Sequence, residues 1–465
     1  MTTSESLPLT FDRELIARLD RNGPRYTSYP TADRFVEAFD ARAYAAWAAR
    51  RNAGGAHRPL SIYVHLPFCA SLCYYCGCNK VITQDAGKGV RYMAALTREI
   101  DMQAALFEAD LRVEQMHWGG GTPTFYSIDA LAALNATLRE RFEFSPDGDY
   151  SIEVDPRTAR ASTMKALADL GFNRASFGVQ DFDPAVQRAV NRVQSEEETR
   201  EVIEGARLAG FRSVNVDLIY GLPLQTLMSF NRTLARVIAL RPDRIAVYNY
   251  AHLPARFKAQ RLISEADLPG ADTKLGLLGL AVQRLTAAGY VYIGMDHFAL
   301  PDDALARAQR EGRLQRNFQG YSTHAECDLI GLGVSAIGAI GPTYSQNARA
   351  LPAYYDAIER HTLPIAQGIE LTPDDLVRRC VIQTLMCQFE LSREMVEIAY
   401  LVDFERYFAP ELEALKVFED AGLVRVADGW ISITATGRML VRSICMVFDR
   451  YLRTQSGRAR YSRTI

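Results

Sequence analysis

The chain has 465 residues, of which 48% are hydrophobic and 23% charged, a composition typical of a globular protein with two or three folded units. Its net charge of −2 argues against binding nucleic acid through bulk charge. No run of about 18 apolar residues occurs, so we expect no membrane insertion. The first residues lack the apolar core of a secretory signal, which predicts a cytoplasmic protein with reduced thiols.

The predicted elements begin with an N-terminal segment, residues 1–58. From residue 59 to 368, short β-rich runs alternate with stretches of helical spacing such as 90–107 and 197–211. The β-rich runs are 60–68, 113–121, 150–156, 174–180, 213–223, 244–253 and 290–298. This alternation predicts parallel strands joined by helical crossovers. Turn residues and polar groups follow the strands, which favours an open, partial α/β barrel over a doubly wound sheet.

The pattern changes after residue 368, and we expect residues 369–465 to form a separate C-terminal domain. The run Thr372–Asp375 begins a helix with a capping residue and an early proline. Two short β-rich runs are joined at Asp428 and Gly429, a pair typical of a hairpin turn. Helices combined with a hairpin predict a mostly helical, winged-helix-like domain.

Four of the eight cysteines lie between Phe68 and Cys78. Three of them, Cys69, Cys73 and Cys76, have the spacing C-x3-C-x2-C directly after a predicted strand. Thiolates in a tight loop suit zinc or an iron–sulfur cluster. Structural zinc usually takes two pairs of ligands separated by a longer loop, so a [4Fe–4S] cluster with one open iron fits better. On spacing alone, a structural zinc loop remains an alternative.

This cysteine motif resembles that of the radical S-adenosylmethionine (SAM) superfamily. The segments "HWGGGTPT", "SIEVDP", "RNFQGYSTH" and "GPRYTSYPT" further resemble the oxygen-independent coproporphyrinogen III oxidases, from about residue 20 to the end. The resemblance implies one [4Fe–4S] cluster, two SAM molecules and a 5′-deoxyadenosyl radical. The implied reaction decarboxylates two propionates of coproporphyrinogen III to vinyl groups, giving protoporphyrinogen IX in haem biosynthesis.

The resemblance also assigns site residues. The cluster ligands are Cys69, Cys73 and Cys76, whereas Cys78 is a fourth thiol that marks the family. The residues implied for the first SAM are Tyr63, Gly120, Glu153 and Ile337. Those implied for the second SAM are Tyr75, Gly121, Thr122, Gln180, Arg192, Asp217 and Ala251.

The substrate has four carboxylates, so cationic contacts are expected, and Arg25 and Arg316 are the candidates. The arginines from Arg438 to Arg463 near the C-terminus are interpreted, for the most part, as a solvated basic tail. No catalytic side chain is assigned beyond the cofactors. A low-potential electron donor such as a flavodoxin or ferredoxin is expected, and the chain is expected to be a monomer whose N-terminal segment and C-terminal domain cover the active site.

Two other functions are compatible with parts of the pattern. A haem chaperone of the same superfamily would share the cysteine and glycine loops, but Cys78 and the segment "PRYTSYPT" favour the oxidase. A zinc-dependent regulator would use the thiol loop with a winged-helix-like end, but the near-neutral charge and the long α/β core argue against it.

Overall fold

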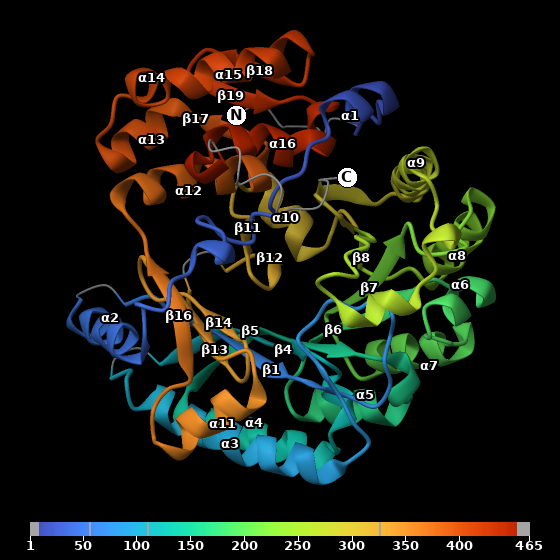
Figure 1. Cartoon of the computed structure of the whole chain (residues 1–465), viewed down its shortest axis with the longest axis vertical. Helices are drawn as coiled ribbons and strands as arrows, with labels where there is room; N and C mark the ends of the chain where they lie inside the picture. Colours follow the sequence, from blue (N-terminus) through green and yellow to red (C-terminus); the bar gives the residue numbers. More distant parts are fainter. Residues whose placement is uncertain (1–8, 55–56, 109–110, 325–326, 453–465) are drawn as a thin grey trace. The chain divides into compact units, whose positions relative to one another are not determined.

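A computed structural model describes residues 9–54, 57–108, 111–324 and 327–452. The chain divides into two compact units, which are described separately (Figure 1). The core unit contains Arg34–Pro269 and Glu326–Glu370. The terminal unit contains Met1–Asp33, Gly270–Ala325 and Leu371–Ile465.

Seven parallel strands form the centre of the core unit, in the spatial order β13-β1-β4-β5-β6-β7-β8. Their bounds are β1 Leu60–Leu66, β4 Arg112–Gly120, β5 Glu143–Val154, β6 Arg174–Gln180, β7 Ser213–Tyr220, β8 Arg244–Asn249 and β13 Asp328–Leu332. The main crossover helices are α3 Ala86–Ala104, α4 Ile128–Arg141, α5 Ala161–Asp169, α7 Glu196–Leu208 and α8 Leu227–Leu240 (Figure 1). The predicted alternation of parallel strands and helices is confirmed.

The central strand β1 shows why this sheet forms. Ser61, Tyr63 and His65 lie on one face of β1 and are buried or half-buried. Leu60, Ile62, Val64 and Leu66 lie on the other face, because side chains alternate along a strand, and all four are fully buried. Burial of each such side chain contributes about 1.5–3 kcal/mol.

Strand β13 is absent from the predicted elements. It has only five residues, contains Gly331 and lies outside the regular strand–helix alternation. Its partner is β1, with Leu60 opposite Asp328 and Val64 opposite Leu332. Sequence spacing gives little warning of a strand that returns from residue 328 to pair with residue 60.

The predicted single strand at 290–298 is wrong. The terminal unit instead has two short antiparallel strands here, β9 Val291–Gly294 and β10 His297–Ala299. The chain reverses at Met295, the first residue after β9, which has φ +51°, a left-handed value that an extended strand does not accommodate.

The last part of the terminal unit begins with helix α12, Pro373–Gln388. Thr372 and Asp375 form a reciprocal capping box at its start, which confirms the predicted helix start. Further elements are α13 Arg393–Tyr400, α14 Phe404–Tyr407, α15 Ala409–Asp420 and α16 Val441–Cys445, with strands β17 Glu390–Ser392, β18 Val424–Ala427 and β19 Trp430–Ile433. The hairpin between β18 and β19 turns at Asp428 and Gly429, both with positive φ, as predicted.

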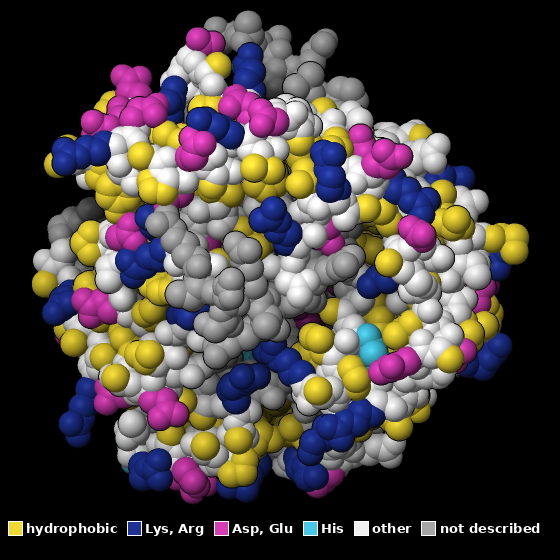
Figure 2. Space-filling view, turned by 45° about the horizontal axis from the view of Figure 1, so that its top comes forward, with side chains coloured by type: hydrophobic (Ala, Val, Ile, Leu, Met, Phe, Trp, Pro, Cys, Tyr) yellow, Lys and Arg dark blue, Asp and Glu magenta, His cyan; other side chains and the backbone are white. Residues whose placement is uncertain are grey.

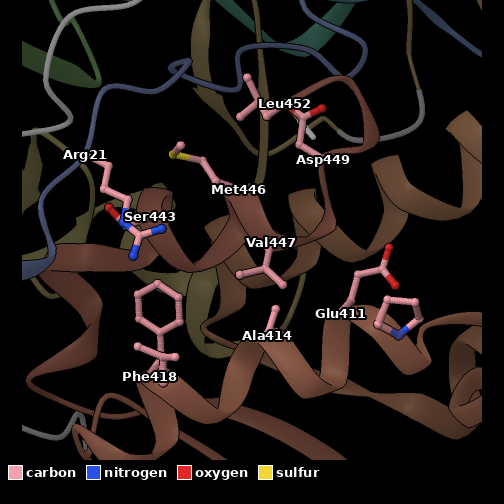
Figure 3. Close-up of a pocket in the computed structure, with 11 residues that line it drawn as sticks. Arg21, Glu411, Ala414, Phe418, Ser443, Met446, Val447, Asp449 and Leu452 are labelled. Atoms are coloured by element: carbon pink, nitrogen blue, oxygen red, sulfur yellow. The ribbon is translucent and has the colours of Figure 1, made fainter. Parts of the chain in front are cut away.

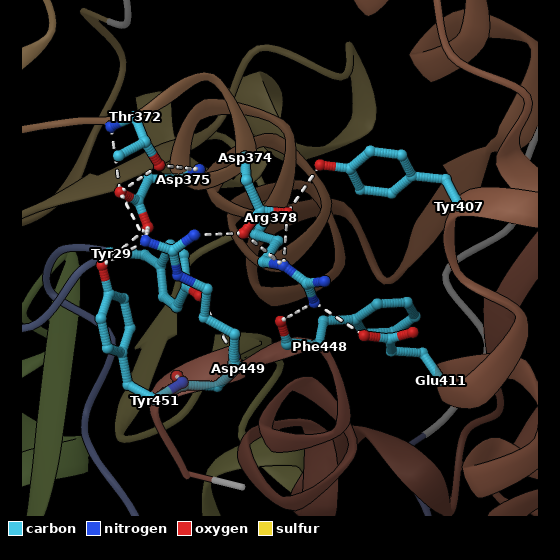
Figure 4. Close-up of polar contacts among 11 residues, drawn as sticks. Tyr29, Thr372, Asp374, Asp375, Arg378, Tyr407, Glu411, Phe448, Asp449 and Tyr451 are labelled. Carbon is cyan, nitrogen blue, oxygen red and sulfur yellow. Dashed lines mark hydrogen bonds and ion pairs between the residues drawn. The ribbon is translucent and has the colours of Figure 1, made fainter.

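Charged side chains hold the C-terminal helices of this unit together (Figure 4). Buried Arg378 pairs with Asp374 at 2.9 Å and with Glu411 at 2.8 Å, and it donates to the Phe448 carbonyl at 2.9 Å. Arg450 pairs with Asp374 at 2.6 Å. Several donors and acceptors are thus satisfied at once, as buried charges require.

For two of the C-terminal arginines, Arg442 and Arg450, the structure corrects the interpretation of a solvated tail. Arg442 is 6% exposed and donates to the carbonyls of Gly23 and Pro24, at 2.9 and 3.1 Å. Arg450 is likewise held by carboxylates. The remaining arginines of the tail, Arg453, Arg458, Arg460 and Arg463, lie outside the described residues.

The N-terminal segment contributes to both units. In the terminal unit, helix α1 (Arg13–Leu19) precedes Tyr26, whose hydroxyl donates to Asp449 at 2.9 Å. In the core unit, Val36 pairs with Gly368, and helix α2 (Ala41–Ala53) follows. The predicted domain boundaries 1–58, 59–368 and 369–465 differ from the bounds of the two compact units. A compact unit need not be a domain, so the three domains stay a prediction.

Among the described helices, none has both the length and the apolar character needed to cross a membrane. On the face drawn in Figure 2, basic and acidic side chains are interspersed. That distribution agrees with the net charge of −2.

Candidate active site

A cavity of about 500 Å³ lies in the core unit, where the carboxyl ends of β1, β4, β5 and β6 meet. Most of the predicted cofactor residues line it: Cys69, Cys73, Cys76, Cys78, Tyr75, Gly120, Gly121, Thr122, Glu153, Gln180, Arg192 and Asp217. Parallel strands bring their carboxyl ends to one edge, which is where such folds build binding sites. The structure therefore brings together side chains from segments more than 100 residues apart.

The cysteine loop is fixed at both of its ends. Strands β2 (Phe68–Cys69) and β3 (Val81–Ile82) pair in parallel and close the loop between them. In the middle, Tyr74 N–H donates to the Val190 carbonyl at 3.0 Å, and Asn191 donates to the Leu72 carbonyl at 2.8 Å. These contacts hold the loop against the segment that follows α6 (Pro184–Ala189).

Each thiol has a different environment. Burial raises the pKa of Cys69 to about 11, although Thr122 donates a hydrogen bond to its Sγ at 3.3 Å. A hydrogen bond from Cys78 is the main cause that lowers the pKa of Cys76 to about 6, with Lys80 adding to it. The same contact raises the pKa of Cys78. Cys73 accepts from Arg192 at 3.5 Å and from Arg157 at 3.6 Å.

This donor set fits an iron–sulfur cluster better than a single metal ion. Within the described ranges, no three His, Cys, Asp or Glu side chains converge as ligands of one ion. Cys69, Cys73 and Cys76 nevertheless line the same cavity. In a [4Fe–4S] cluster each thiolate binds a different iron, so the ligands stand apart around a large group. The thiols are free, without disulfide bonds.

The glycine loop after β4 requires glycine for steric reasons. A Cβ on Gly120, which has φ +112°, would lie 2.5 Å from the His65 ring. A Cβ on Gly119 would lie 2.8 Å from the carboxyl carbon of Glu153, and one on Gly121 would lie 2.6 Å from the Pro67 carbonyl carbon. These approaches place unhindered backbone beside the cavity.

Glu153, near the end of β5, is held by donors on one side. Its carboxylate accepts from Gly120 N–H at 3.1 Å and lies 3.4 Å from His117 Nε2. His117 Nδ1 is 2.6 Å from Ser151 Oγ, and its ring stacks on Tyr63. Burial alone would raise the pKa of Glu153, but His117 and the Gly120 amide hold it below the usual value. Glu153 is thus kept ionised at neutral pH.

Another part of the cavity lining combines an ion-paired arginine with an acid that can be protonated. Arg192 is 7% exposed, pairs with Asp155 at 3.1 Å and donates to the Gly178 carbonyl at 2.6 Å. Asp217 accepts from Ser176 at 2.9 Å and from Asn215 at 2.8 Å. Burial raises the pKa of Asp217 to about 6.

Three predicted cofactor residues do not line this cavity. Tyr63 lies behind it on β1 and contacts His65 and His117. Ile337 is on the short strand β14 (Ile337–Gly338), whose backbone lies against Gly331 of β13. Ala251 follows β8, and its carbonyl accepts from Gln260.

The two substrate candidates belong to the terminal unit. Arg25 pairs with Asp296 at 2.9 Å, and Arg316 lies over the ring of Tyr321. Neither lines the cavity of the core unit.

Other lining residues had not been singled out from the sequence. They are Ala70, Ser71, Lys80, Pro123, Val154, Asp155, Arg157, Thr158, Ser176, Gly178 and Tyr248. Asp155 and Arg157 had a sequence signal, because they directly follow a strand in "SIEVDPRT". Ser176 and Tyr248 had no sequence signal. Each lies within a strand, where a serine or a tyrosine is an ordinary polar or core residue.

A second cavity, of about 420 Å³, lies in the terminal unit (Figure 3). Phe418, Val447 and Leu452 give it an apolar wall, and Glu411 and Asp449 lie at its edge. It contains no predicted site residue.

Comparison with known proteins agrees with the cysteine motif. Residues 63–237 match the model of the Radical SAM superfamily, and residues 371–440 match that of the HemN C-terminal domain. An oxygen-independent coproporphyrinogen III oxidase from Pseudomonas aeruginosa is 53% identical, covering 98% of this chain and 99% of the relative. The Escherichia coli protein of the same description is 49% identical, with the same coverage of both chains.

A solved structure gives the same result. Coproporphyrinogen III oxidase (HemN) from Escherichia coli, described as a radical SAM enzyme, matches with a TM-score of 0.90 and 48% identity, covering 95% of this chain and 99% of that chain. The α/β core therefore has the radical SAM fold. With full-length identity near 50%, the chain belongs to the family of oxygen-independent coproporphyrinogen III oxidases.

Proposed function

We propose that this chain converts two propionate side chains of coproporphyrinogen III to vinyl groups without oxygen, giving protoporphyrinogen IX for haem biosynthesis. One observation carries the proposal: three thiols, a glycine loop and Glu153 line one cavity in a chain 53% identical to such an oxidase. The relatives named above are oxidases, which supports this function over a haem chaperone or a zinc-dependent regulator.

Cys69, Cys73 and Cys76 would hold a [4Fe–4S] cluster, and its open iron would take the first SAM. The first SAM would lie against Gly120 and Glu153, with Tyr63 and Ile337 behind it. Support comes from the ionised carboxylate of Glu153, which suits ribose hydroxyls or an ammonium group as donors. When bound, the cluster and SAM supply the radical that removes hydrogen from a propionate.

A second SAM would occupy the wall formed by Tyr75, Gly121, Thr122, Gln180, Arg192, Asp217 and Ala251. Arg192 is already paired with Asp155, so its remaining capacity to bind a carboxylate is reduced. Asp217 offers a carboxylate to the cationic part of the ligand once it is ionised.

The chain's own residues orient and shield the reactants. Arg192 and Arg157 donate toward Cys73, and Thr122 toward Cys69, so each of these sulfurs has a defined partner. Radical chemistry requires exclusion of water and of other side chains. We include in the proposal that residues 1–58 cover the active site, which a turnover assay on a chain lacking them would test.

The finer architecture is part of the same proposal. The core sheet would curve into an open, partial barrel, as its open strand order suggests. The three-stranded sheet β17-β19-β18 with α12, α13 and α15 supports a winged-helix-like C-terminal domain. A cytoplasmic monomer that receives electrons from a flavodoxin or ferredoxin completes the proposal.

The decisive experiment is anaerobic turnover. Reconstituted protein is incubated with coproporphyrinogen III, SAM and a strong reductant, and the oxidised products are separated by chromatography. We expect the divinyl product from the wild type and none from Cys69→Ala. Absence of product from protein that carries its full iron content would contradict the proposed function.

A further inference from the structure

Arg316 is a buried cation that forms no ion pair with any carboxylate in the described part of the chain. It lies on the hairpin formed by β11 (Gln315–Asn317) and β12 (Gly320–Ser322) and is 5% exposed. Its Nε and Nη1 atoms are buried and make no hydrogen bond among the described residues. Its guanidinium lies over the ring of Tyr321, 4.9 Å from the centroid.

Such an arrangement is unusual for an arginine. Buried guanidinium groups are normally paired and hydrogen-bonded, because an unpaired buried charge is strongly unfavourable. Arg378 of the same unit shows the normal case, since two carboxylates and a carbonyl satisfy it (Figure 4). Arg316 therefore has donor capacity that no residue described in the structure uses.

A second observation comes from the turn of the same hairpin. Both side-chain amide atoms of Gln319, Nε2 and Oε1, are buried and have no hydrogen-bond partner among the described residues. Two buried side chains of one hairpin that both have unused donors indicate a site for a polar ligand rather than an isolated defect.

The charges around Arg316 indicate the sign of that ligand. The positive charges of Arg25 and Arg316 both lower the pKa of Arg442, which is 6% exposed. Two carboxylates, Asp296 and Asp20, raise the pKa of Arg442. Asp296 also pairs with Arg25 at 2.9 Å. Arg316 therefore lies in a region where other guanidinium charges also act, which favours an anion over a cation as its ligand.

We propose that Arg316 binds a propionate carboxylate of the porphyrinogen. This inference rests on the proposed function, which supplies a ligand with four carboxylates and an apolar ring. A carboxylate accepts charge-assisted hydrogen bonds from the unused donors of Arg316. Arg316 is then a substrate-binding residue whose burial cost the bound substrate offsets.

The test separates ligand binding from stability. Arg316→Met removes the unpaired charge but keeps the length of the side chain, so melting temperature without ligand should stay at or above the wild-type value. Arg378→Met is the matched contrast, because it removes a paired buried cation and should lower the melting temperature. Arg425→Gln, at an exposed position of β18, controls for loss of charge and should change neither quantity.

Binding is measured by fluorescence titration with coproporphyrin III, the oxidised form of the substrate, which keeps four propionates. We expect Arg316→Met to weaken Kd about 10- to 100-fold, the range of one lost charge-assisted hydrogen bond. Arg316→Lys should recover part of the loss. Iron content and SAM affinity should equal those of the wild type, and KM for coproporphyrinogen III should rise more than kcat falls.

Two results would overturn the inference. One is a wild-type Kd and KM in Arg316→Met. The other is a fall in melting temperature as large as that of Arg378→Met, which would assign Arg316 a structural role. If the wild type binds coproporphyrin III but forms no divinyl product, the proposed function fails and not the carboxylate site.

Discussion

Thr122 donates its hydroxyl hydrogen bond to Cys69 Sγ at 3.3 Å, which joins the glycine loop to the cysteine loop. The backbone repeats this connection, because Gly121 N–H donates to the Leu66 carbonyl at 2.8 Å and Thr122 N–H to the Phe68 carbonyl at 3.0 Å. Two segments about 50 residues apart therefore form one platform beside the cavity. A change in either loop is expected to act on the other.

Replacement of single cysteines should separate ligands from the fourth thiol. We expect Cys78→Ala to retain near-normal iron content and lose activity, because Cys78 contacts Cys76 but is not one of the three proposed ligands. Cys69→Ala should lose most of its iron. Iron and sulfide analysis with the visible absorption spectrum measures both. Equal loss of iron in the two variants would contradict the assignment of three ligands.

Gly120→Ala should be severely disruptive. Its Cβ would lie 2.5 Å from the His65 ring, and its φ of +112° strains any L side chain. Strain of this kind costs about 1–3 kcal/mol before the steric overlap is added. We expect loss of SAM binding, measured by equilibrium dialysis, together with a lower melting temperature.

Gly210→Ala is the matched control for that prediction. Gly210 has φ +88°, and a Cβ there would meet no atom within 4 Å. It therefore carries the cost of positive φ without the clash or the proximity to the cavity. If Gly210→Ala reduced SAM binding as much as Gly120→Ala, the effect would be one of general stability.

The sequence predicts the parts of this fold that local patterns determine. Strand β6 follows directly from the alternation of apolar residues along it, and the capping box at Thr372 follows from capping chemistry. Strand β13 could not be found in the same way, since its pairing with β1 joins residues about 270 apart. The burial of Arg442 could not be predicted from the sequence either, because its partners are backbone carbonyls and not an acidic side chain.

The same distinction holds for the candidate site. The cysteine and glycine motifs are short, and the spacing of their residues is visible in the sequence, so their resemblance to a known family identified them. The pairing of Arg192 with Asp155 depends on how β5 and the segment after β6 meet, and no local signal in either segment encodes it.

The affinity for the proposed second SAM should depend on pH through Asp217. Burial raises its pKa to about 6, so the carboxylate is protonated below that pH and charged above it. A cationic ligand is therefore bound more weakly at pH 5 than at pH 7.5, by about tenfold if ionisation is required. Asp217→Asn should bind weakly at both values, as measured by isothermal titration calorimetry.

Asp169→Asn controls for removal of an acid, because Asp169 lies on the surface of α5 and pairs with Lys165. It should retain the pH dependence of the wild type. A pH dependence that persists unchanged in Asp217→Asn would assign the titration to a different group.

The stability of the core unit should depend on pH through Glu99, a fully buried acid on α3. Its carboxylate accepts hydrogen bonds from Gly333 N–H, Asn347 and Tyr354, at 2.8, 2.7 and 2.6 Å. Among the described residues no lysine or arginine pairs with it, and burial raises its pKa from 4.5 to about 7. The folded state therefore binds this proton more tightly than the unfolded state does.

Between pH 4.5 and 7 the unfolded chain releases the Glu99 proton first, so the free energy of unfolding falls as pH rises, by about 3 kcal/mol for this group alone. Glu99→Gln cannot titrate, so its stability relative to the wild type should improve steadily over this range and level off above pH 7. Urea unfolding of both proteins from pH 4.5 to 8 measures the difference. Exposed Glu140→Gln is the control and should follow the wild type throughout. A constant difference between Glu99→Gln and the wild type would mean that the pKa of Glu99 is the same in the folded and unfolded states, which contradicts the prediction.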